Sequence, residues 1–382
     1  MKFAHTGDCH LGGWRQPEMI ELNLKSLSLF VDSCLKEKVD FVLIAGDFFD
    51  SAYPPIDAIK TAFDQLRRLK EAQVPVFIIA GSHDYSASGK SFIDVLEKAD
   101  FVRNASRPEL RENIIYLSPL VYKGVAIYGY PGKRSALEVE DIKRIKLHES
   151  PGMYTILMLH TALRDAVGNL PIPAVDQDKL PKVNYLALAH LHVKYERNGR
   201  VYCGPLFPNS VAELEELGGG SFYIVDTNGK TERHELNLKP VITLDVPITD
   251  TTRLIDEAQT LFEKQNLKDS IVILRLTGIF ENGLPASVRL IELEQMAKKK
   301  GAYAVLKNTS GIKGAEGSFL FASPGEELEE TIIKRFKEEH DSELNRLIEP
   351  LLHTLEAEKK EEEKSALFEE RIYEDFRKAV HV

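Results

Sequence analysis

Five short apolar runs in the first half of the chain each end in side chains that commonly bind metal ions. The runs are four to six residues long and rich in Val, Ile, Leu, Phe and Tyr, as expected of buried parallel strands. Polar residues that follow such strands collect at one edge of an open α/β sheet. The five segments are Asp8-Cys9-His10, Gly46-Asp47-Phe48-Phe49-Asp50, Gly81-Ser82-His83-Asp84, His160 and His190-Leu191-His192.

Taken as ligands, these segments fit two metal ions and offer too many groups for one. Carboxylate and imidazole groups together suit Mn, Fe or Zn, and the sequence has no Cys cluster of the kind that holds structural zinc. Asp47 is the best candidate to bridge two ions roughly 3.5–4 Å apart, the arrangement used in phosphoryl transfer. The candidate ligands are Asp8, His10, Asp47, His160, His190 and His192, with Ser82 and His83 beside them.

The spacing within two of the segments predicts which side chains share a face. Asp8 and His10 flank Cys9, so on a strand both would point the same way while Cys9 points into the sheet. His190 and His192 repeat this pattern. A single His or Gly-Asp at a strand end commonly has only a structural role. The metal hypothesis therefore depends on all five segments occurring in this order.

In this order the segments resemble the calcineurin-type metallophosphoesterases, whose pattern is Asp-x-His, Gly-Asp-x-x-Asp, Gly-Asn-His-Asp/Glu, His and Gly-His-x-His. Within that superfamily the chain is most similar to the SbcD/Mre-eleven DNA double-strand-break repair nucleases. Protein phosphatases of the superfamily carry Arg after the second and third motifs, where this chain has Ser51 and Tyr85. The resemblance covers residues 1–240 well and the remainder by architecture only. It depends on residues 1–5, 8–12, 44–50, 54–55 and 92–96.

The resemblance implies a role for each candidate residue. Asp8, His10, Asp47 and His192 would hold one ion, and Asp47, Ser82, His160 and His190 would surround the other. His83 would not be a ligand; it would assist the leaving group or the crowded phosphate, for which an imidazole that titrates near neutrality is suited. The nucleophile would be a metal-activated water. Two positions depart from the pattern, because Ser82 replaces Asn and Ala189 replaces the Gly before the paired histidines.

The activity implied is that of a DNA nuclease dependent on two divalent ions, with Mn²⁺ as the expected metal. By resemblance it would act as a 3′-5′ double-strand exonuclease and single-strand endonuclease on DNA ends, single strands or hairpins, in double-strand-break repair. One alternative is a phosphatase or phosphodiesterase of the same superfamily. Another is a scaffold that holds DNA ends, in which Ser82 marks a weakened site.

Length and composition favour an intracellular enzyme of two or three domains. The chain has 382 residues, enough for a substantial core. Its three scattered cysteines, Cys9, Cys34 and Cys203, form no disulfide framework. No signal peptide and no apolar run of about 18 residues is recognisable. We therefore expect a cytoplasmic setting without membrane association.

The formal net charge of −10 is concentrated near the end of the sequence. Residues 325–382 contain 18 Asp and Glu against 10 Lys and Arg, whereas residues 1–324 contain 41 acidic and 39 basic residues. A nearly balanced region can still present basic patches to phosphates. The charge therefore neither demonstrates nor excludes a nucleic-acid partner.

The order of elements predicts an α/β fold, a two-sheet metallophosphoesterase sandwich flanked by helices. Residues 1–240 alternate strands with helical patterns. Residues 222–225 and 233–236 read as a hairpin around the turn 227–230, expected to complete the second sheet. Residues 241–309 read as a small α/β domain, which by resemblance caps the nuclease domain and orients DNA. Residues 310–324 read as a linker.

Residues 325–382 predict amphipathic helices with no domain to cover. They could pack on each other as a hairpin with a solvated charged face. The resemblance favours the other interpretation, a segment that binds an SMC-like coiled-coil ABC ATPase. The resemblance also implies a homodimer through the helical patterns at 56–69 and 91–98. The apolar residues of those patterns could equally be ordinary core: Ile59, Phe63, Leu66, Phe92 and Leu96.

Overall fold

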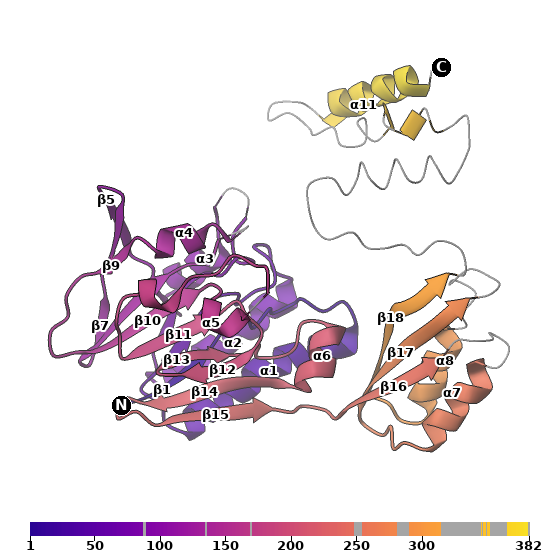
Figure 1. Cartoon of the computed structure of the whole chain (residues 1–382), viewed down its shortest axis with the longest axis horizontal. Helices are drawn as coiled ribbons and strands as arrows, with labels where there is room; N and C mark the ends of the chain where they lie inside the picture. Colours follow the sequence, from indigo (N-terminus) through magenta and orange to yellow (C-terminus); the bar gives the residue numbers. More distant parts are fainter. Residues whose placement is uncertain are drawn as a thin grey trace. The chain divides into compact units, whose positions relative to one another are not determined.

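The structure is a computed structural model in which the chain forms two compact units, Met1–Ala315 and Glu316–Val382 (Figure 1). No helix among the described residues has the length and apolar character needed to cross a lipid bilayer. The described residues are 1–86, 89–133, 136–168, 170–247, 254–280, 290–314, 345, 347, 348, 350, 351 and 365–380.

The first sheet contains the strands that precede the first three motifs. Its order is β15-β14-β1-β2-β3-β4, and β1 to β4 are parallel. The strands are β1 (Lys2–Thr6), β2 (Phe41–Ile44), β3 (Val76–Ile78), β4 (Arg103–Asn104), β14 (Gly220–Asp226) and β15 (Thr231–Leu236).

The second sheet contains the strands that precede the last two motifs. Its order is β12-β13-β11-β10-β8-β7, with β8, β10, β11 and β13 parallel. An apolar layer that includes Phe3, Phe41, Ile127 and Ile156 fills the space between the two sheets. The predicted sandwich is confirmed. The strands are β7 (Leu120–Tyr122), β8 (Val125–Tyr130), β10 (Tyr154–His160), β11 (Tyr185–Ala189), β12 (Lys194–Arg197) and β13 (Arg200–Cys203).

The predicted hairpin is present but belongs to the other sheet. Strands β14 and β15 pair antiparallel around the turn, as expected. The prediction that they complete the second sheet is wrong, because β14 pairs with β1 of the first sheet. This pairing covers the backbone groups of β1 that β2 leaves free, so β1 lies inside the sheet.

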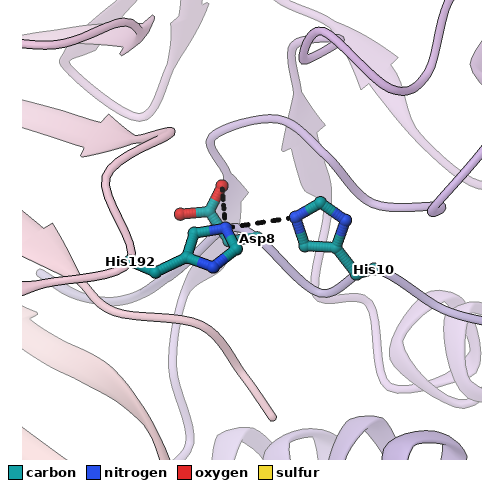
Figure 2. Close-up of side chains that lie close together, drawn as sticks. All are labelled: Asp8, His10 and His192. Carbon is teal, nitrogen blue, oxygen red and sulfur yellow. Dashed lines mark hydrogen bonds and ion pairs between the residues drawn. The ribbon is translucent and has the colours of Figure 1, made fainter. Parts of the chain in front are cut away.

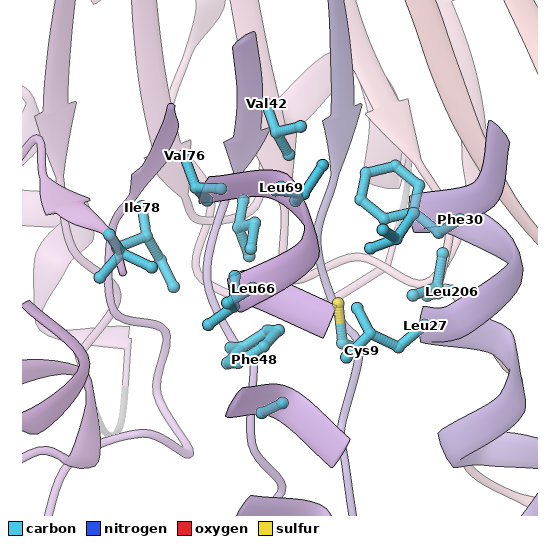
Figure 3. Packing of buried hydrophobic residues seen from close by; sticks show 14 of the residues in the cluster. Cys9, Leu27, Phe30, Val42, Phe48, Leu66, Leu69, Val76, Ile78 and Leu206 are labelled. Atoms are coloured by element: carbon cyan, nitrogen blue, oxygen red, sulfur yellow. The ribbon is translucent and has the colours of Figure 1, made fainter. Parts of the chain in front are cut away.

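Helices cover the outer face of each sheet. On the first sheet these are α1 (Pro17–Lys36), α2 (Ile56–Glu71) and α3 (Phe92–Lys98). Helix α1 begins with Pro17, which lacks an N–H group, and the first N–H groups of a helix have no partner within the helix. The helix buries one face, with Leu27, Phe30, Val31 and Cys34 at helical spacing. Figure 3 shows part of this layer between helices and sheet. The second sheet carries α4 (Glu138–Ile142), α5 (Arg164–Val167) and a small sheet of β5 (Pro108–Arg111), β6 (Ile114–Leu117) and β9 (Ile145–Leu147).

Helices α2 and α3 point their predicted dimer residues largely inward. Leu66 and Leu96 are fully buried in the core, and Phe63 packs against it. The exposed large apolar side chains on these two helices are instead Ile56, the first residue of α2, and Val95 on α3. The core interpretation of Leu66 and Leu96 is therefore the right one.

A third, parallel sheet of β16 (Val241–Pro247), β17 (Ile271–Phe280) and β18 (Ala304–Gly314) packs with α7 (Leu254–Glu263) and α8 (Leu290–Lys299). Strand β18 includes the first residues of the predicted linker. We call residues 241–314 the cap subdomain. An apolar cluster joins it to the two-sheet sandwich of residues 1–240 through Trp14, Met19, Leu22, Phe207 and Leu214 on one side and Ile271, Ile273, Ala304 and Leu306 on the other.

The second unit contains the helix α11 (Ser365–Val380). It agrees with the helical character predicted for the end of the chain. Most of the helical pattern predicted for residues 325–364 lies outside the described residues.

The two sheets are in close contact just after β1 and at the end of β11. A Cβ atom placed on Gly7 would lie 2.6 Å from the Cβ of Ala189, well inside van der Waals contact. Ala189 is the residue that departs from the Gly of the metallophosphoesterase pattern. The missing side chain at Gly7 leaves room for the methyl group of Ala189.

We expect Gly7→Ala to destabilise the protein by about 1–3 kcal/mol, because the added methyl group overpacks the contact between the sheets. The double variant Gly7→Ala with Ala189→Gly should recover most of this loss. Denaturant unfolding of the wild type, both single variants and the double variant measures the coupling. Additive losses in the double variant would contradict this packing argument.

Candidate metal centre

The five motif segments meet where the carboxyl ends of the two sheets adjoin. The loops after β1, β2 and β3 bring in the groups of the first three motifs, and β10 and β11 end at His160 and just before His190. Gly46 permits this convergence, because a Cβ atom there would lie 2.4 Å from Nδ1 of His160. The first and second motif loops run side by side, with Asp8 N donating to Gly46 O at 3.0 Å.

Four candidate ligands adopt the left-handed backbone conformation that non-glycine residues rarely use. The φ angles of Asp8, His10, Asp47 and His190 are 47°, 42°, 45° and 93°. Each such residue costs on the order of 1–3 kcal/mol and persists only where its surroundings enforce it. The prediction that Asp8 and His10 share a strand face is therefore wrong in its geometry. Both still point to the site, and Cys9 is fully buried in the core, because the loop winds through these conformations.

Asp8, His10 and His192 form one group of potential ligands (Figure 2). The Nε2 atoms of the two histidines face each other at 3.2 Å, and His192 Nε2 lies 3.9 Å from Asp8 Oδ1. The backbone N–H of His190 donates to both carboxylate oxygens of Asp8 at 3.0 Å. The three side chains thus converge on one small volume with their ligating atoms inward.

Asp47 lies between this group and a second one. Its Oδ2 atom is 3.8 Å from His10 Nε2 and 3.0 Å from His160 Nε2. Asp8, Asp47 and His160 have ligating atoms within 4.8 Å of one another. The Nε2 atom of His160 is buried and faces this Asp47 oxygen, without hydrogen-bond geometry to any partner in the described residues. Asp47 therefore occupies the position of a bridging ligand.

Ser82, His83 and His190 lie beside the second group. The Ser82 hydroxyl donates to Asp47 Oδ2 at 3.4 Å, and the His83 backbone N–H donates to Asp47 Oδ1 at 2.8 Å. The His190 ring lies 5.0 Å from that of His160, measured between centroids. The fold thus gathers every residue that the sequence nominates.

The carboxylates make this volume strongly attractive to cations. Burial lowers the pKa of His160, but the adjacent Asp47 outweighs burial and raises it to about 9. Burial also lowers the pKa of His192. The nearby Asp8 and Glu213 outweigh burial and raise this pKa to about 9. Burial works against ionisation of Asp47, yet the nearby His160 and His10 hold its pKa well below the usual range.

These shifts indicate that the residues fit divalent metal ions. Protons on His160 and His192 offset the buried carboxylates when no metal is bound, and a divalent ion can take their place. His190 is shifted in the opposite direction. Burial and the neighbouring His160 lower its pKa to about 4. A neutral imidazole is the form that ligates a metal.

Two carboxylates that the sequence analysis did not nominate support the histidines from behind. Asp50 Oδ1 lies 3.0 Å from Nδ1 of His10, and Glu213 Oε2 lies 3.0 Å from Nδ1 of His192. A carboxylate in this position fixes the ring and its tautomer. Asp50 belongs to the second motif, three residues after Asp47, so the sequence could have indicated that it lies near the site. Glu213 stands in no metal motif, and only the fold brings it to the site.

Asp84 has a structural role in the third motif. Its buried carboxylate accepts hydrogen bonds from the backbone N–H groups of Phe48, Phe49 and Gly81 at 2.9–3.2 Å. Burial and the Asp47 charge raise the pKa of Asp84 to about 6. This carboxylate ties the second and third motif loops together, which holds Asp47 and Ser82 in place.

Comparisons with known proteins agree with this geometry. One similar protein is the DNA double-strand break repair protein Mre11 of Archaeoglobus fulgidus, 30% identical over 232 residues, 56% of this chain and about half (51%) of that protein. The Mre11 protein of Sulfurisphaera tokodaii is 28% identical over 342 residues, 82% of each chain. The uncharacterised metallophosphoesterase YhaO of Bacillus subtilis is 26% identical over 299 residues, 72% of this chain and 71% of that protein.

A family model described as calcineurin-like phosphoesterase matches residues 1–194, which is half of the chain. The matched region contains all five motif segments and the strands that precede them, β1, β2, β3, β10 and β11. The chain therefore belongs to the calcineurin-like phosphoesterase family.

Proposed function

We propose that the protein is a DNA nuclease that hydrolyses phosphodiester bonds with two divalent metal ions and acts in double-strand-break repair. The observation that carries the proposal is the convergence of Asp8, His10 and His192 with Asp47 and His160 at the junction of the two sheets. The names of the Archaeoglobus and Sulfurisphaera relatives support DNA as the substrate.

The first ion would be held by Asp8, His10, Asp47 and His192, and the second by Asp47, His160 and His190 with Ser82 beside them. Two such ions, Mn²⁺ in this proposal, would supply positive charge for the phosphate and an activated water. The orientation of the Asp47 carboxylate is fixed, because the Ser82 hydroxyl and the His83 backbone N–H donate to its two oxygens.

His83 would transfer a proton to the leaving oxygen. Its Nδ1–H donates to the Asp50 carbonyl oxygen at 2.9 Å, so the ring, when protonated on both nitrogens, would present its Nε2–H to the leaving oxygen. Its ring is about half exposed and meets the His10 ring edge-on, with 4.8 Å between centroids. The imidazole thus lies on the open side of the ligand groups, where a phosphodiester would bind.

The wider assignments rest on resemblance to the repair nucleases. We propose activity as a 3′-5′ double-strand exonuclease and single-strand endonuclease, a homodimer, a cytoplasmic location, and an SMC-like ABC ATPase as partner of residues 325–382. None of the described side chains of the charged helix α11 is buried, and Tyr373 and Phe376 are exposed, which supports a binding role for this segment.

One comparison tests the nuclease assignment directly. Purified protein is incubated with Mn²⁺ and either single-stranded and linear double-stranded DNA or a small phosphomonoester. We expect cleavage of DNA and little hydrolysis of the monoester. Preference for the monoester would make the protein a phosphatase, and no hydrolysis of either would make it a scaffold.

His83→Gln should reduce DNA cleavage by roughly 10²–10⁴-fold, because Gln cannot donate a proton to the leaving oxygen. Both metal affinities should stay unchanged, because His83 is assigned to proton transfer and not to ligation. Rates from gel assays and affinities from manganese calorimetry give the two quantities. His148→Gln, a partly buried histidine outside the site, is the matched control. Loss of a metal in His83→Gln would contradict the assignment.

Ser82→Asn should tighten binding of the second ion and lower the Mn²⁺ concentration for half-maximal cleavage. A Ser hydroxyl is shorter than an Asn side chain and a poorer ligand than an amide oxygen, so the native second site should be the weaker one. Calorimetric titration with Mn²⁺ measures both sites. Two equally tight sites in the wild type, unchanged by the substitution, would show that Ser82 is an adequate replacement.

Truncation after Ala315 should leave DNA cleavage intact and abolish association with the ATPase, because residues 1–315 form a compact unit of their own. Co-purification of the tagged full-length and truncated proteins with the ATPase measures the association, and circular dichroism checks the fold. Retained association would place the ATPase contact within residues 1–315.

A further inference from the structure

Helix α6 (Val211–Leu217) begins with a capping arrangement that also reaches the metal centre. Ser210 is the N-cap, and its hydroxyl accepts from the backbone N–H of Glu213 at 3.2 Å. The Glu213 carboxylate turns back and accepts from the backbone N–H of Asn209 at 2.9 Å. The pair is similar to a capping box, with the carboxylate on the N–H of the residue before the N-cap, and it fixes the direction of the Glu213 side chain.

The same Glu213 oxygen that caps the helix also contacts a candidate ligand. Oε2 lies 3.0 Å from Nδ1 of His192, while His192 Nε2 faces His10 and Asp8. A ring bound at Nδ1 presents Nε2 in one direction only. The orientation of His192 therefore follows the position of the first turn of α6.

The next two residues of α6 contact the cap subdomain. Leu214 is buried in the apolar cluster shared with Ile271 and Ile273. Glu215 Oε1 accepts from Nε and Nη2 of Arg275 on β17 at 3.2 and 3.0 Å. Three consecutive residues of one short helix thus touch the metal centre, the shared core and a strand of the cap subdomain.

Asn209 extends this connection to the other supported histidine. Its side-chain N–H donates to Asp50 Oδ1 at 3.1 Å, the oxygen that lies 3.0 Å from His10 Nδ1. Its backbone N–H donates to Glu213. The two carboxylates behind the first ion's histidines are therefore held by a single residue at the start of α6.

We propose that Glu213 is a positioning residue for His192, and that α6 couples the seating of the cap subdomain to the affinity of the first metal ion. The inference rests on the proposed role of His192 as a ligand. A displacement of β17 relative to the sandwich pulls on Glu215, shifts the first turn of α6 and turns the His192 ring away from Asp8. Metal affinity then reports the position of the cap subdomain.

The first experiment titrates metal-free protein with Mn²⁺ by calorimetry, using wild type, Glu213→Gln and His192→Ala. Glu213→Gln keeps a capping-box residue but removes the charge behind His192, so the first site should weaken by about 10- to 100-fold with the helix intact. Wild-type affinity in Glu213→Gln, with loss of the site in His192→Ala, would overturn the positioning role. Wild-type binding in His192→Ala would instead overturn the ligand assignment made under the proposed function.

The second experiment compares Arg275→Met with Lys307→Met in the same titration. Arg275 pairs with Glu215 across the junction, whereas Lys307, on the neighbouring strand, pairs with Glu294 inside the cap subdomain. We expect the first site to weaken by about 3- to 10-fold in Arg275→Met only. Thermal unfolding of both variants verifies that the cap subdomain stays folded. Equal affinities in the two variants would overturn the coupling.

Discussion

The contact between the carboxyl ends of the two sheets is the constraint on which the candidate metal centre depends. Asp8 and Asp47 come from the first sheet, whereas His160 and His192 come from the second. Neither sheet alone carries a complete set of ligands. The sheets can approach because Gly7 and Gly46 have no side chains where Ala189 and His160 pass. The affinity for metal is therefore a property of the sandwich, and any change that separates the sheets separates the ligands.

The centre brings together groups that repel or strain one another in the absence of metal. Two imidazole nitrogens face each other, and several ligand residues hold left-handed backbone conformations. The surrounding structure offsets this cost with directed hydrogen bonds. Asp84 fixes two loops through three backbone N–H groups, and His190 N fixes the Asp8 carboxylate. Such preorganisation favours a bound cation, because the protein has already oriented its ligands.

The sequence predicted that the candidate ligands would lie together, because they follow strands and the ends of parallel strands meet at one edge. It predicted the sandwich for the same reason. It failed on the sheet to which β14 belongs, because hairpin signals specify the turn and not the partner strand. The left-handed loop around Cys9 was also missed, since residue spacing alone does not distinguish it from a strand. Glu213 follows Asn209 and Ser210 in a pattern that indicates only a helix start.

The chain order of the ligands has a consequence for biosynthesis. A ribosome delivers residues 8–84 early, yet the groups that complete the first ligand set, His192 and its support Glu213, emerge more than a hundred residues later. Strand β14, which covers the free edge of β1, comes later still. Until then the nascent chain exposes an unpaired strand and a partial ligand set. A chain that ends before His192 thus lacks part of the candidate ligand group, and one that ends before Gly220 also lacks the strand that covers β1.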